Sequence, residues 1–237
     1  MATFVLVHGT TAGGWVWKTV AAQLEQTGHV VYRPTLTGLG ERVHLLTREV
    51  GLDTHIADVV NHILYEELTD VVLVGHSYGG MVITGVADRV PDRIRELVYF
   101  DAVVPQDGES AVDLYGRPTY EHFAKLVADE GDGWLIPVQR GPNDLPAKNG
   151  PHPWKSWTDP ITLTNAAATS VIPRTYVRFT ADKQPGQVWD DAFAETWRRI
   201  RREPSGRGWR VRELDTMHQI LPDPHSKAAI LLELFPE

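Results

Sequence analysis

The sequence predicts an α/β protein with a mostly parallel central sheet and helices on both faces of that sheet. Three observations support this prediction. Short, continuously apolar runs recur along the chain, for example over 71–74 and 97–100, and such runs are typical of strands buried in a parallel sheet. Segments with apolar residues at helical spacing separate these runs. The strand–helix alternation is that of parallel strands joined by crossover helices.

The expected elements follow one another from the N-terminus to residue 104. Strands are expected over 4–7, 30–32, 71–74 and 97–100. Helices are expected over 15–26, over 53–66 with Asp53 as the capping residue, and from residue 79 to about residue 90. After residue 173 the pattern resumes, with strands over 175–179 and 209–214 and helices over 189–201 and 226–234.

Residues 105–173 interrupt this rhythm. The stretch is rich in proline and glycine and is too long for a plain loop. We therefore expect a lid with short helices, inserted into an α/β core formed by residues 1–104 and 174–237. Aromatic side chains of the lid could line an apolar substrate pocket, or they could form the lid's own small core. These aromatic residues are Tyr115, Tyr120, Phe123, Trp134, Trp154 and Trp157.

Composition limits the classes of function. The formal net charge of −8 argues against a nucleic-acid partner, because phosphates repel an acidic surface. The chain has no cysteine, which excludes disulfides, thiolate chemistry and cysteine-ligated metals. No apolar run reaches the length of a membrane span and no signal-peptide pattern stands at the N-terminus, so we expect a cytoplasmic protein. The oligomeric state stays open between a monomer and a homodimer.

The most specific motif is the pentad Gly75-His76-Ser77-Tyr78-Gly79, which lies between an expected strand and an expected helix. It has the form G-x-S-x-G, a turn that presents a serine hydroxyl above the end of a strand. Glycines two residues before and two residues after Ser77 leave room for the strained backbone of that turn. The N-terminus of the next helix directs N–H groups at developing negative charge. The pattern predicts a serine nucleophile that attacks a carbonyl carbon.

A serine nucleophile needs a base to take its proton and a carboxylate to orient that base. In sheets of this type the chain order is serine, acid, histidine. His218 follows the last expected strand and is predicted to be the base. Asp182 is the preferred acid because it follows the strand over 175–179. Asp101 is the alternative, since the end of the strand over 97–100 can also reach the histidine.

Two backbone N–H groups are expected to stabilise the oxyanion that forms during attack. The residue after the nucleophile supplies one of them, so Tyr78 is predicted to contribute its N–H. The loop after the first strand supplies the other, and Thr10 is the expected donor.

The other histidines receive simpler interpretations. His8 ends the first strand at the carboxyl edge of the sheet, where ligands bind in such folds, and is a candidate substrate contact. His76 is expected to pack and to form hydrogen bonds rather than to act as a second base. His55 and His62 lie seven residues apart on one expected helix and are interpreted as part of a solvated face. No metal ion or other cofactor is expected.

The chain resembles the α/β-hydrolase fold family in FVLVHGTTAGGWVW, GHVVYRPTLTGLGERVH, VVLVGHSYGGMVI, LVYFDAVVP, FTADK and MHQILPDP. Within this family it is similar to bacterial carboxylesterases of the pyrethroid-hydrolase and salicylate-ester type. Plant methyl-salicylate esterases and hydroxynitrile lyases are more distant. The resemblance covers nearly the whole chain and is weakest in the lid. It implies a triad of Ser77, His218 and Asp182, with Thr10 and Tyr78 as oxyanion donors.

The resemblance implies hydrolysis of hydrophobic or aromatic carboxylic esters, or of lactones, through an acyl-enzyme and without a cofactor. The lyases carry a threonine where this chain has Gly9 and a lysine where it has Gln219. A cyanide leaving group needs a nearby cation, so cyanohydrin cleavage is disfavoured. A cofactor-free oxygenase and a ligand receptor on the same fold remain alternatives. The plant esterases carry a small neutral residue at the position of Asp101, which keeps the assignment of the acid open.

Overall fold

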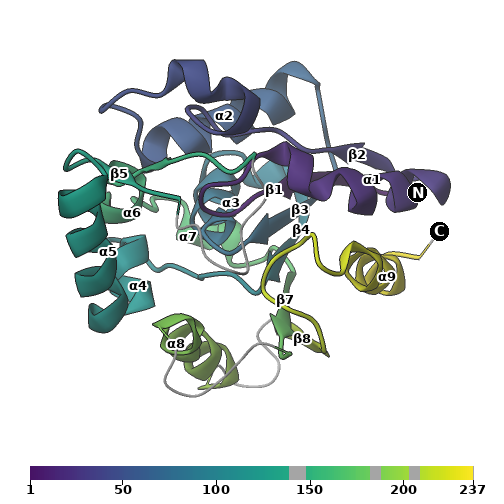
Figure 1. Ribbon diagram of the computed structural model, residues 1–237. Helices are drawn as coiled ribbons and strands as arrows, with labels where there is room; N and C mark the ends of the chain where they lie inside the picture. The colour runs from purple at the N-terminus through teal and green to yellow at the C-terminus, as the bar shows by residue number, and fades with distance from the viewer. Residues whose placement is uncertain (139–147, 182–187, 203–208, 237) are drawn as a thin grey trace.

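The computed structural model contains a sheet of six strands with helices on both of its faces (Figure 1). The structure describes residues 1–138, 148–181, 188–202 and 209–236. The strand order is β2-β1-β3-β4-β7-β8, and every neighbouring pair is parallel. The strands are β1 (Thr3–Val7), β2 (Val30–Tyr32), β3 (Val71–His76), β4 (Ile94–Phe100), β7 (Arg174–Phe179) and β8 (Trp209–Leu214).

Side chains of the central strands are buried on both faces of the sheet. In β3, Val72 and Val74 pack toward α1 (Lys18–Gln26) and α9 (Pro224–Leu234). Val71 and Leu73 point to the opposite face, which α2 (Leu52–Tyr65) and α3 (Gly79–Arg89) cover. Because a strand buried on both faces needs apolar residues at every position, the sequence showed continuous apolar runs rather than alternation. The predicted α/β class is confirmed.

The ends of the elements differ slightly from the sequence expectations. The expected helix over 15–26 begins as a 3-10 turn, η1 (Gly14–Trp17), before α1 starts. The prediction that Asp53 caps the second helix is wrong. Helix α2 begins after Gly51, and the N–H of Leu52 donates to Oδ2 of Asp159 at 3.2 Å. Asp159 lies 107 positions after Leu52 in the chain, so no local sequence pattern could indicate this contact.

Residues 105–173, between β4 and β7, form a region that we call the cap. It includes a two-stranded antiparallel sheet and short helices beside the central sheet (Figure 1). Helix α8 (Val188–Arg202) follows β7 and packs against the first two cap helices. The cap elements are α4 (Ala111–Tyr115), α5 (Arg117–Glu130), β5 (Leu135–Ile136), β6 (His152–Pro153), α6 (Lys155–Thr158) and α7 (Ala166–Thr169).

Asp88, at the end of α3, anchors the chain where it returns from the cap. Its buried carboxylate accepts the N–H of Thr164 at 3.0 Å and the N–H of Asn165 at 2.7 Å. A buried carboxylate without such donors would be costly, so the anchor and the burial of Asp88 depend on each other. The contact ties the second half of the cap to the helix that follows the nucleophile.

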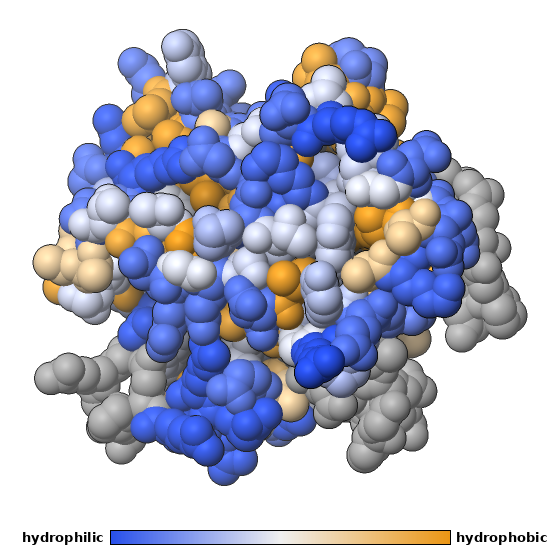
Figure 2. Space-filling view, turned by 90° about the vertical axis from the view of Figure 1, so that its left-hand side faces the viewer, coloured by the Kyte–Doolittle hydropathy of each residue, from blue (hydrophilic) through white to orange (hydrophobic). Residues whose placement is uncertain are grey.

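The cap is largely hydrophilic outside and aromatic inside. Figure 2 looks onto the side that carries α4 and α5, and its apolar surface lies in separate patches between hydrophilic residues. Tyr115, Phe123 and Trp157 are buried, whereas Tyr120 keeps 43% of its surface exposed. Within the described part of the chain, no helix has both the length and the apolar character needed to cross a lipid bilayer.

Candidate active site

Ser77 occupies the sharp turn between β3 and α3. Its φ of +57° lies in the left-handed region, which residues other than glycine rarely adopt. Three backbone hydrogen bonds hold this strained residue. Its N–H donates to the carbonyl of Phe100 at 3.3 Å, and its own carbonyl accepts from Gly80 at 3.1 Å and from Val103 at 3.2 Å. The end of the neighbouring strand β4 thus fixes the turn that presents the serine.

Two glycines leave the space that this turn requires. A Cβ atom on Gly75 would lie 2.7 Å from the carbonyl oxygen of Gly79, so the first glycine of the motif is a steric requirement. A Cβ atom on Gly9 would lie 2.9 Å from the Cβ of Ser77 itself. The loop after β1 therefore passes directly beside the serine.

His218 lies in the loop between β8 and α9, and its Nδ1 is 2.7 Å from Oδ2 of Asp101. Asp101 follows β4 directly, is fully buried and has a φ of +43°. Its other oxygen accepts the N–H of Phe179 at 3.3 Å. A buried carboxylate keeps a proton on Nδ1 of the ring, which leaves Nε2 of the neutral imidazole as the basic nitrogen.

Asp101 is the alternative acid of the sequence analysis, and the structure brings it onto His218. Asp182, the acid preferred from the sequence, lies outside the described residues. The sequence did contain a sign of Asp101, because the serine and this aspartate follow adjacent strands and meet at one edge of the sheet. Chain order alone favoured a later aspartate.

His76, the residue before the serine, forms a hydrogen bond with the loop between β8 and α9 that carries His218. Its Nε2 donates to the carbonyl oxygen of His218 at 2.7 Å, and the two ring centroids lie 4.6 Å apart. Burial lowers the pKa of His76 well below its usual value, and the nearby His218 lowers this pKa further. A neutral, hydrogen-bonded His76 is the role that the sequence analysis expected.

Lys227 of α9 braces the same loop and was not singled out by the sequence analysis. This fully buried ammonium group donates to Oγ1 of Thr216 at 2.9 Å and to the carbonyl of Asp223 at 3.3 Å. It also lies 5.0 Å from the ring centroid of Phe179, within range of a cation–π interaction. No sequence pattern indicated this role, because a lysine in a terminal helix is usually solvated.

The loop of residues 8–14 lies beside the serine and offers backbone donors. Among the hydrogen bonds of the described residues, none is donated by the N–H of Thr10 or of Tyr78. Tyr78 immediately precedes α3, where the helix dipole favours negative charge. Both predicted oxyanion donors are therefore available to an anionic oxygen.

His8 holds this loop in place through both of its ring nitrogens. Nε2 accepts the N–H of Leu36 at 3.1 Å, so Nδ1 carries the proton and donates to the carbonyl of Gly9 at 2.9 Å. Burial lowers the pKa of His8 to about 4. The side chain is fully buried and both of its ring nitrogens form hydrogen bonds with backbone groups. In this structure His8 therefore stabilises the loop.

His55 lies in the interior, so the expectation of a solvated helix face is wrong for this residue. Its Nε2 donates to the carbonyl of Thr37 at 3.1 Å, and its Nδ1 lies 2.9 Å from the hydroxyl of Tyr78. Burial lowers the pKa of His55 to about 4, so the neutral ring accepts the tyrosine hydroxyl. Sequence periodicity could not find this contact, because a histidine looks polar until its partner is known.

Aromatic side chains of the cap pack against one another. Trp157 lies 4.7 Å from Tyr115, 5.0 Å from Phe123 and 5.9 Å from Trp154 between ring centroids, and Trp154 lies 6.0 Å from Tyr120. These rings form a small core of the cap, which is one of the two roles left open by the sequence, and the lining of a substrate pocket stays a prediction.

Tyr115 and Trp134 have different neighbours outside the cap. Burial raises the pKa of the Tyr115 hydroxyl, and the neighbouring Ser77 side chain opposes that shift. Tyr115 therefore lies near the nucleophile. The ring of Trp134, another predicted substrate contact, lies under the Arg48 guanidinium, with 5.1 Å from its centroid to the guanidinium carbon.

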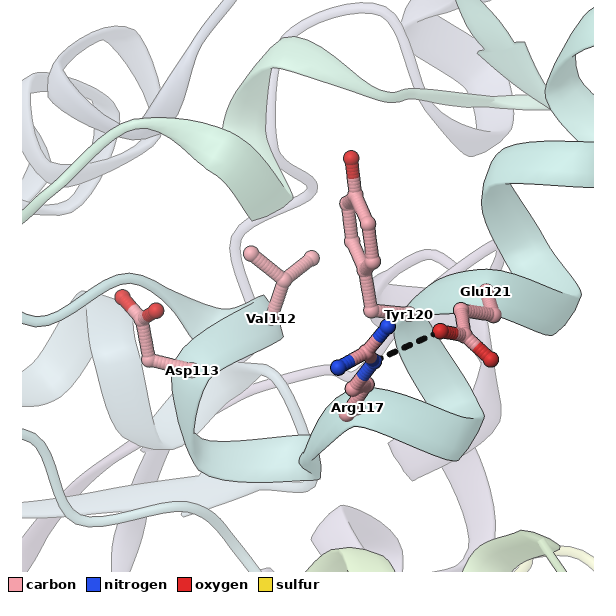
Figure 3. A pocket seen from close by; sticks show the side chains of 5 residues that line it. All are labelled: Val112, Asp113, Arg117, Tyr120 and Glu121. Carbon is pink, nitrogen blue, oxygen red and sulfur yellow. Dashed lines mark hydrogen bonds and ion pairs between the residues drawn. The ribbon is translucent and has the colours of Figure 1, made fainter.

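An open hollow of about 480 Å³ lies between α4 and α5 (Figure 3). It contains an ion pair in which Nε of Arg117 lies 2.7 Å from Glu121. Tyr120 is the predicted substrate residue that borders it. Ser77 is not among the residues that line this hollow. Its lining residues are Val112, Asp113, Arg117, Tyr120 and Glu121.

Comparisons with known proteins agree with the fold. A model of the alpha/beta hydrolase family matches residues 4–230. The carbendazim hydrolyzing esterase of Nocardioides sp. (strain SG-4G) is 59% identical over 114 residues, which cover 48% of this chain and 47% of that protein. Methylesterase 7 of Arabidopsis thaliana is 34% identical over 128 residues, which cover 53% of this chain and 46% of the relative. The chain thus spans less than half the length of these curated relatives.

Solved structures extend the similarity over the whole chain. An extracellular alpha/beta-hydrolase from a Paenibacillus species aligns over 100% of both chains with a TM-score of 0.82 and 26% identity. It is described as sharing structural and functional homology with tobacco salicylic acid binding protein 2. The pyrethroid hydrolase PytH aligns over 99% of this chain and 98% of its own with a TM-score of 0.70, and at 20% identity it supports the fold alone.

Proposed function

The chain belongs to the alpha/beta hydrolase family, and from that premise we propose that it is a serine esterase. In this proposal it cleaves carboxylic esters through an acyl-enzyme, with Ser77 as nucleophile, His218 as base and Asp101 as acid. One observation carries the proposal. The buried Asp101 carboxylate lies 2.7 Å from Nδ1 of His218, at the sheet edge where Ser77 sits in a strained turn.

The proposed reaction follows from the placement of these groups. Nε2 of His218 takes the proton of the Ser77 hydroxyl as the oxygen attacks the ester carbonyl. The imidazolium that forms donates Nδ1–H to Asp101, whose negative charge stabilises it. His218 then passes the proton to the leaving alcohol. Water attacks the acyl-enzyme by the same sequence and releases the acid.

The negative charge that develops on the carbonyl oxygen needs donors fixed in advance. The N–H groups of Thr10 and Tyr78 fill this role in the proposal, because they flank the serine and no described partner occupies them. Gly9 keeps the Thr10 side of the site close to the nucleophile. The 2.9 Å approach of a Cβ on Gly9 to Ser77 also leaves no room for the threonine of the lyases, which favours hydrolysis over cyanohydrin cleavage.

The proposed substrate is a methyl ester of a flat aromatic acid or a methyl carbamate of a flat aromatic amine. Two observations support this class. The relatives reported above are named a carbendazim hydrolyzing esterase and a methylesterase, and carbendazim is a methyl carbamate on a benzimidazole ring. In addition, Tyr115 lies near the nucleophile and belongs to an aromatic cluster that includes Trp157 and Phe123. Aromatic rings stack on flat, apolar acyl groups.

The test measures methanol release from carbendazim and methyl salicylate by the purified wild-type protein and by Ser77→Ala. We expect turnover of at least one of these substrates, and a loss of about 10⁶-fold in kcat for Ser77→Ala. Ser170→Ala is the matched control, because Ser170 is exposed at the end of α7 and should keep activity within about twofold. Activity that survives Ser77→Ala would contradict a serine esterase.

The substrate class is tested with a second pair of esters that share the leaving group. Methyl benzoate and methyl hexanoate both release methanol, but only the first has a flat aromatic acyl group. We expect kcat/KM to be about tenfold higher for methyl benzoate, since one aromatic contact contributes on the order of 1 kcal/mol. The reverse order would overturn the aromatic preference and leave the esterase assignment intact.

A further inference from the structure

We call the loop of residues 8–14 the oxyanion loop. It contains a strained residue, Thr11, that is not held by hydrogen bonds from the described strands of the central sheet. Thr11 has a φ of +62°, and a β-branched residue in this region is a genuine outlier. Such a conformation costs on the order of 1–3 kcal/mol and persists only where surrounding contacts enforce it. The peptide group that joins Thr10 to Thr11 carries the N–H of Thr11, so contacts that hold Thr11 also restrain the backbone of Thr10.

Each polar group of Thr11 is bonded to one segment of the cap. The N–H of Thr11 donates to Nδ1 of His152 at 3.3 Å, and its carbonyl accepts the N–H of Gly150 at 3.0 Å. Its hydroxyl oxygen accepts from Nδ2 of Asn149 at 2.9 Å. The same segment reaches the preceding residue, because Nε1 of Trp157 donates to Oγ1 of Thr10 at 3.1 Å.

His152 is present as the tautomer that can accept the N–H of Thr11. Because a backbone N–H can only donate, Nδ1 of His152 is the unprotonated nitrogen and Nε2 carries the proton. Nε2 donates to Oγ of Ser156 at 2.8 Å, and that hydroxyl in turn donates to the carbonyl of Pro153 at 2.8 Å. The cap itself therefore sets the tautomer that Thr11 needs.

The surroundings of His152 keep the ring neutral and fixed. The side chain is fully buried, and its ring centroid lies 5.0 Å from Tyr78 and 5.7 Å from His55. Burial lowers the pKa of His152 well below its usual value, and the neighbouring His55 and His8 lower this pKa further. No role in proton transfer follows from this position, since Nε2 faces Ser156 rather than the nucleophile.

We propose that His152 is a positioning residue of the oxyanion hole, which holds Thr11 in its left-handed conformation so that the N–H of Thr10 faces the developing oxyanion. The inference rests on the proposed function, because an oxyanion forms only if Ser77 attacks a carbonyl. Its consequence is specific. Loss of the Thr11–His152 hydrogen bond lowers kcat and leaves substrate binding nearly unchanged, since the oxyanion exists only along the reaction path.

Two substitutions of similar size separate positioning from packing. In His152→Asn the amide oxygen stands where Nδ1 stood and can still accept the N–H of Thr11. In His152→Leu a side chain of similar shape has no acceptor. We expect His152→Leu to lower kcat by about 10²-fold with KM within about threefold of the wild type, and His152→Asn to recover most of that loss.

A double-mutant cycle tests the role of strain directly. Thr11→Gly removes the penalty for a positive φ, so a loop with glycine depends less on His152. We expect His152→Leu to cost about tenfold less in the Thr11→Gly background than in the wild type. Additive effects would overturn the proposed strain mechanism.

Amide hydrogen exchange provides a readout that needs no turnover. The Thr11 amide should be protected in the wild type and in His152→Asn and exchange faster in His152→Leu, while amides of β3 stay protected in all three. Equal protection in all three proteins, or equal kcat in the wild type and His152→Leu, would overturn the inference alone. If the wild type hydrolyses no ester, the proposed function fails, and the inference with it. His152→Ala, which also lacks the acceptor for the Thr11 N–H, replaces His152→Leu if the latter fails to fold.

Discussion

The edge of the sheet and the cap contribute to the same site in different ways. The sheet edge provides Ser77, Asp101 and His218, which follow β3, β4 and β8. The cap provides Tyr115, which lies near the serine, and a segment that binds the loop after β1. The groups proposed for bond making thus come from the most regular part of the molecule. The contacts that orient the oxyanion loop come from its least regular part.

Strained residues show the difference most clearly. Ser77 and Asp101 have φ values of +57° and +43°, and backbone atoms of adjacent strands hold both of them. Thr11 has a φ of +62°, and the atoms that hold it belong to cap residues 138 and more positions away. A substitution at the sheet edge should therefore abolish chemistry, whereas a change in the cap should reduce its efficiency.

The largest expected effect distinguishes two candidate acids. Asp101→Asn should lower kcat by about 10⁴-fold, because the amide holds His218 in the wrong tautomer and cannot stabilise the imidazolium. Asp182→Asn is the matched control and should keep kcat within about threefold. Steady-state hydrolysis of methyl salicylate measures both. A large loss in Asp182→Asn with little change in Asp101→Asn would reverse the assignment.

The next effect concerns the close approach of the oxyanion loop to the nucleophile. In Gly9→Ala the new Cβ would lie 2.9 Å from the Cβ of Ser77, so one of the two must move. We expect kcat to fall by about 10²-fold, as displacements of about 1 Å can cost that much. Gly150→Ala is the control, because a Cβ there meets no atom within 4 Å and its N–H still donates to Thr11. Equal activity of the two variants would contradict the tight geometry.

A third prediction concerns the pH dependence of stability. Burial lowers the pKa values of His8 and His55 to about 4 in the folded protein, below their value in the unfolded chain. As the pH falls, the unfolded chain takes up protons first, so the free energy of unfolding declines from about pH 6.5 toward pH 4. Between pH 7 and pH 5 we expect a loss on the order of 2 kcal/mol for each histidine.

Urea unfolding at several pH values measures this loss. His55→Gln should remove one histidine's share of the decline, whatever its effect on stability at pH 7. A free energy of unfolding that stays constant between pH 7 and pH 5 would show that these rings are not held neutral at the junction of core and cap.

The smallest effect tests how the cap is attached to the core. Asp88→Ala leaves the N–H groups of Thr164 and Asn165 without their acceptor, so we expect the free energy of unfolding to fall by about 2 kcal/mol. Asp92→Ala, where the side chain is 79% exposed, should change it by less than about 0.5 kcal/mol. Chemical denaturation compares the two. Similar losses would indicate that the Asp88 contacts do not anchor the cap.

The sequence was most informative where structure is local. The G-x-S-x-G pentad identified the turn at Ser77, and apolar runs located the strands, because both depend on neighbouring residues along the chain. It was least informative about which aspartate pairs with His218. Asp101 and Asp182 both follow expected strands, and only the position of His218 in space connects Asp101 to the base. For the same reason, the capping role given to Asp53 belongs to Asp159.

The sequence by itself determined the α/β class, the strained serine turn and the histidine loop, since each is encoded by residues that are adjacent in the chain or follow the order of strands. Only the tertiary structure decided that Asp101 contacts His218, that His55 is buried against Tyr78 and that His152 holds Thr11. These pairs are separated by 117, 23 and 141 positions. Hydrogen bonds depend on distance in space, and periodicity along a chain carries no record of which distant groups the fold brings within hydrogen-bond distance.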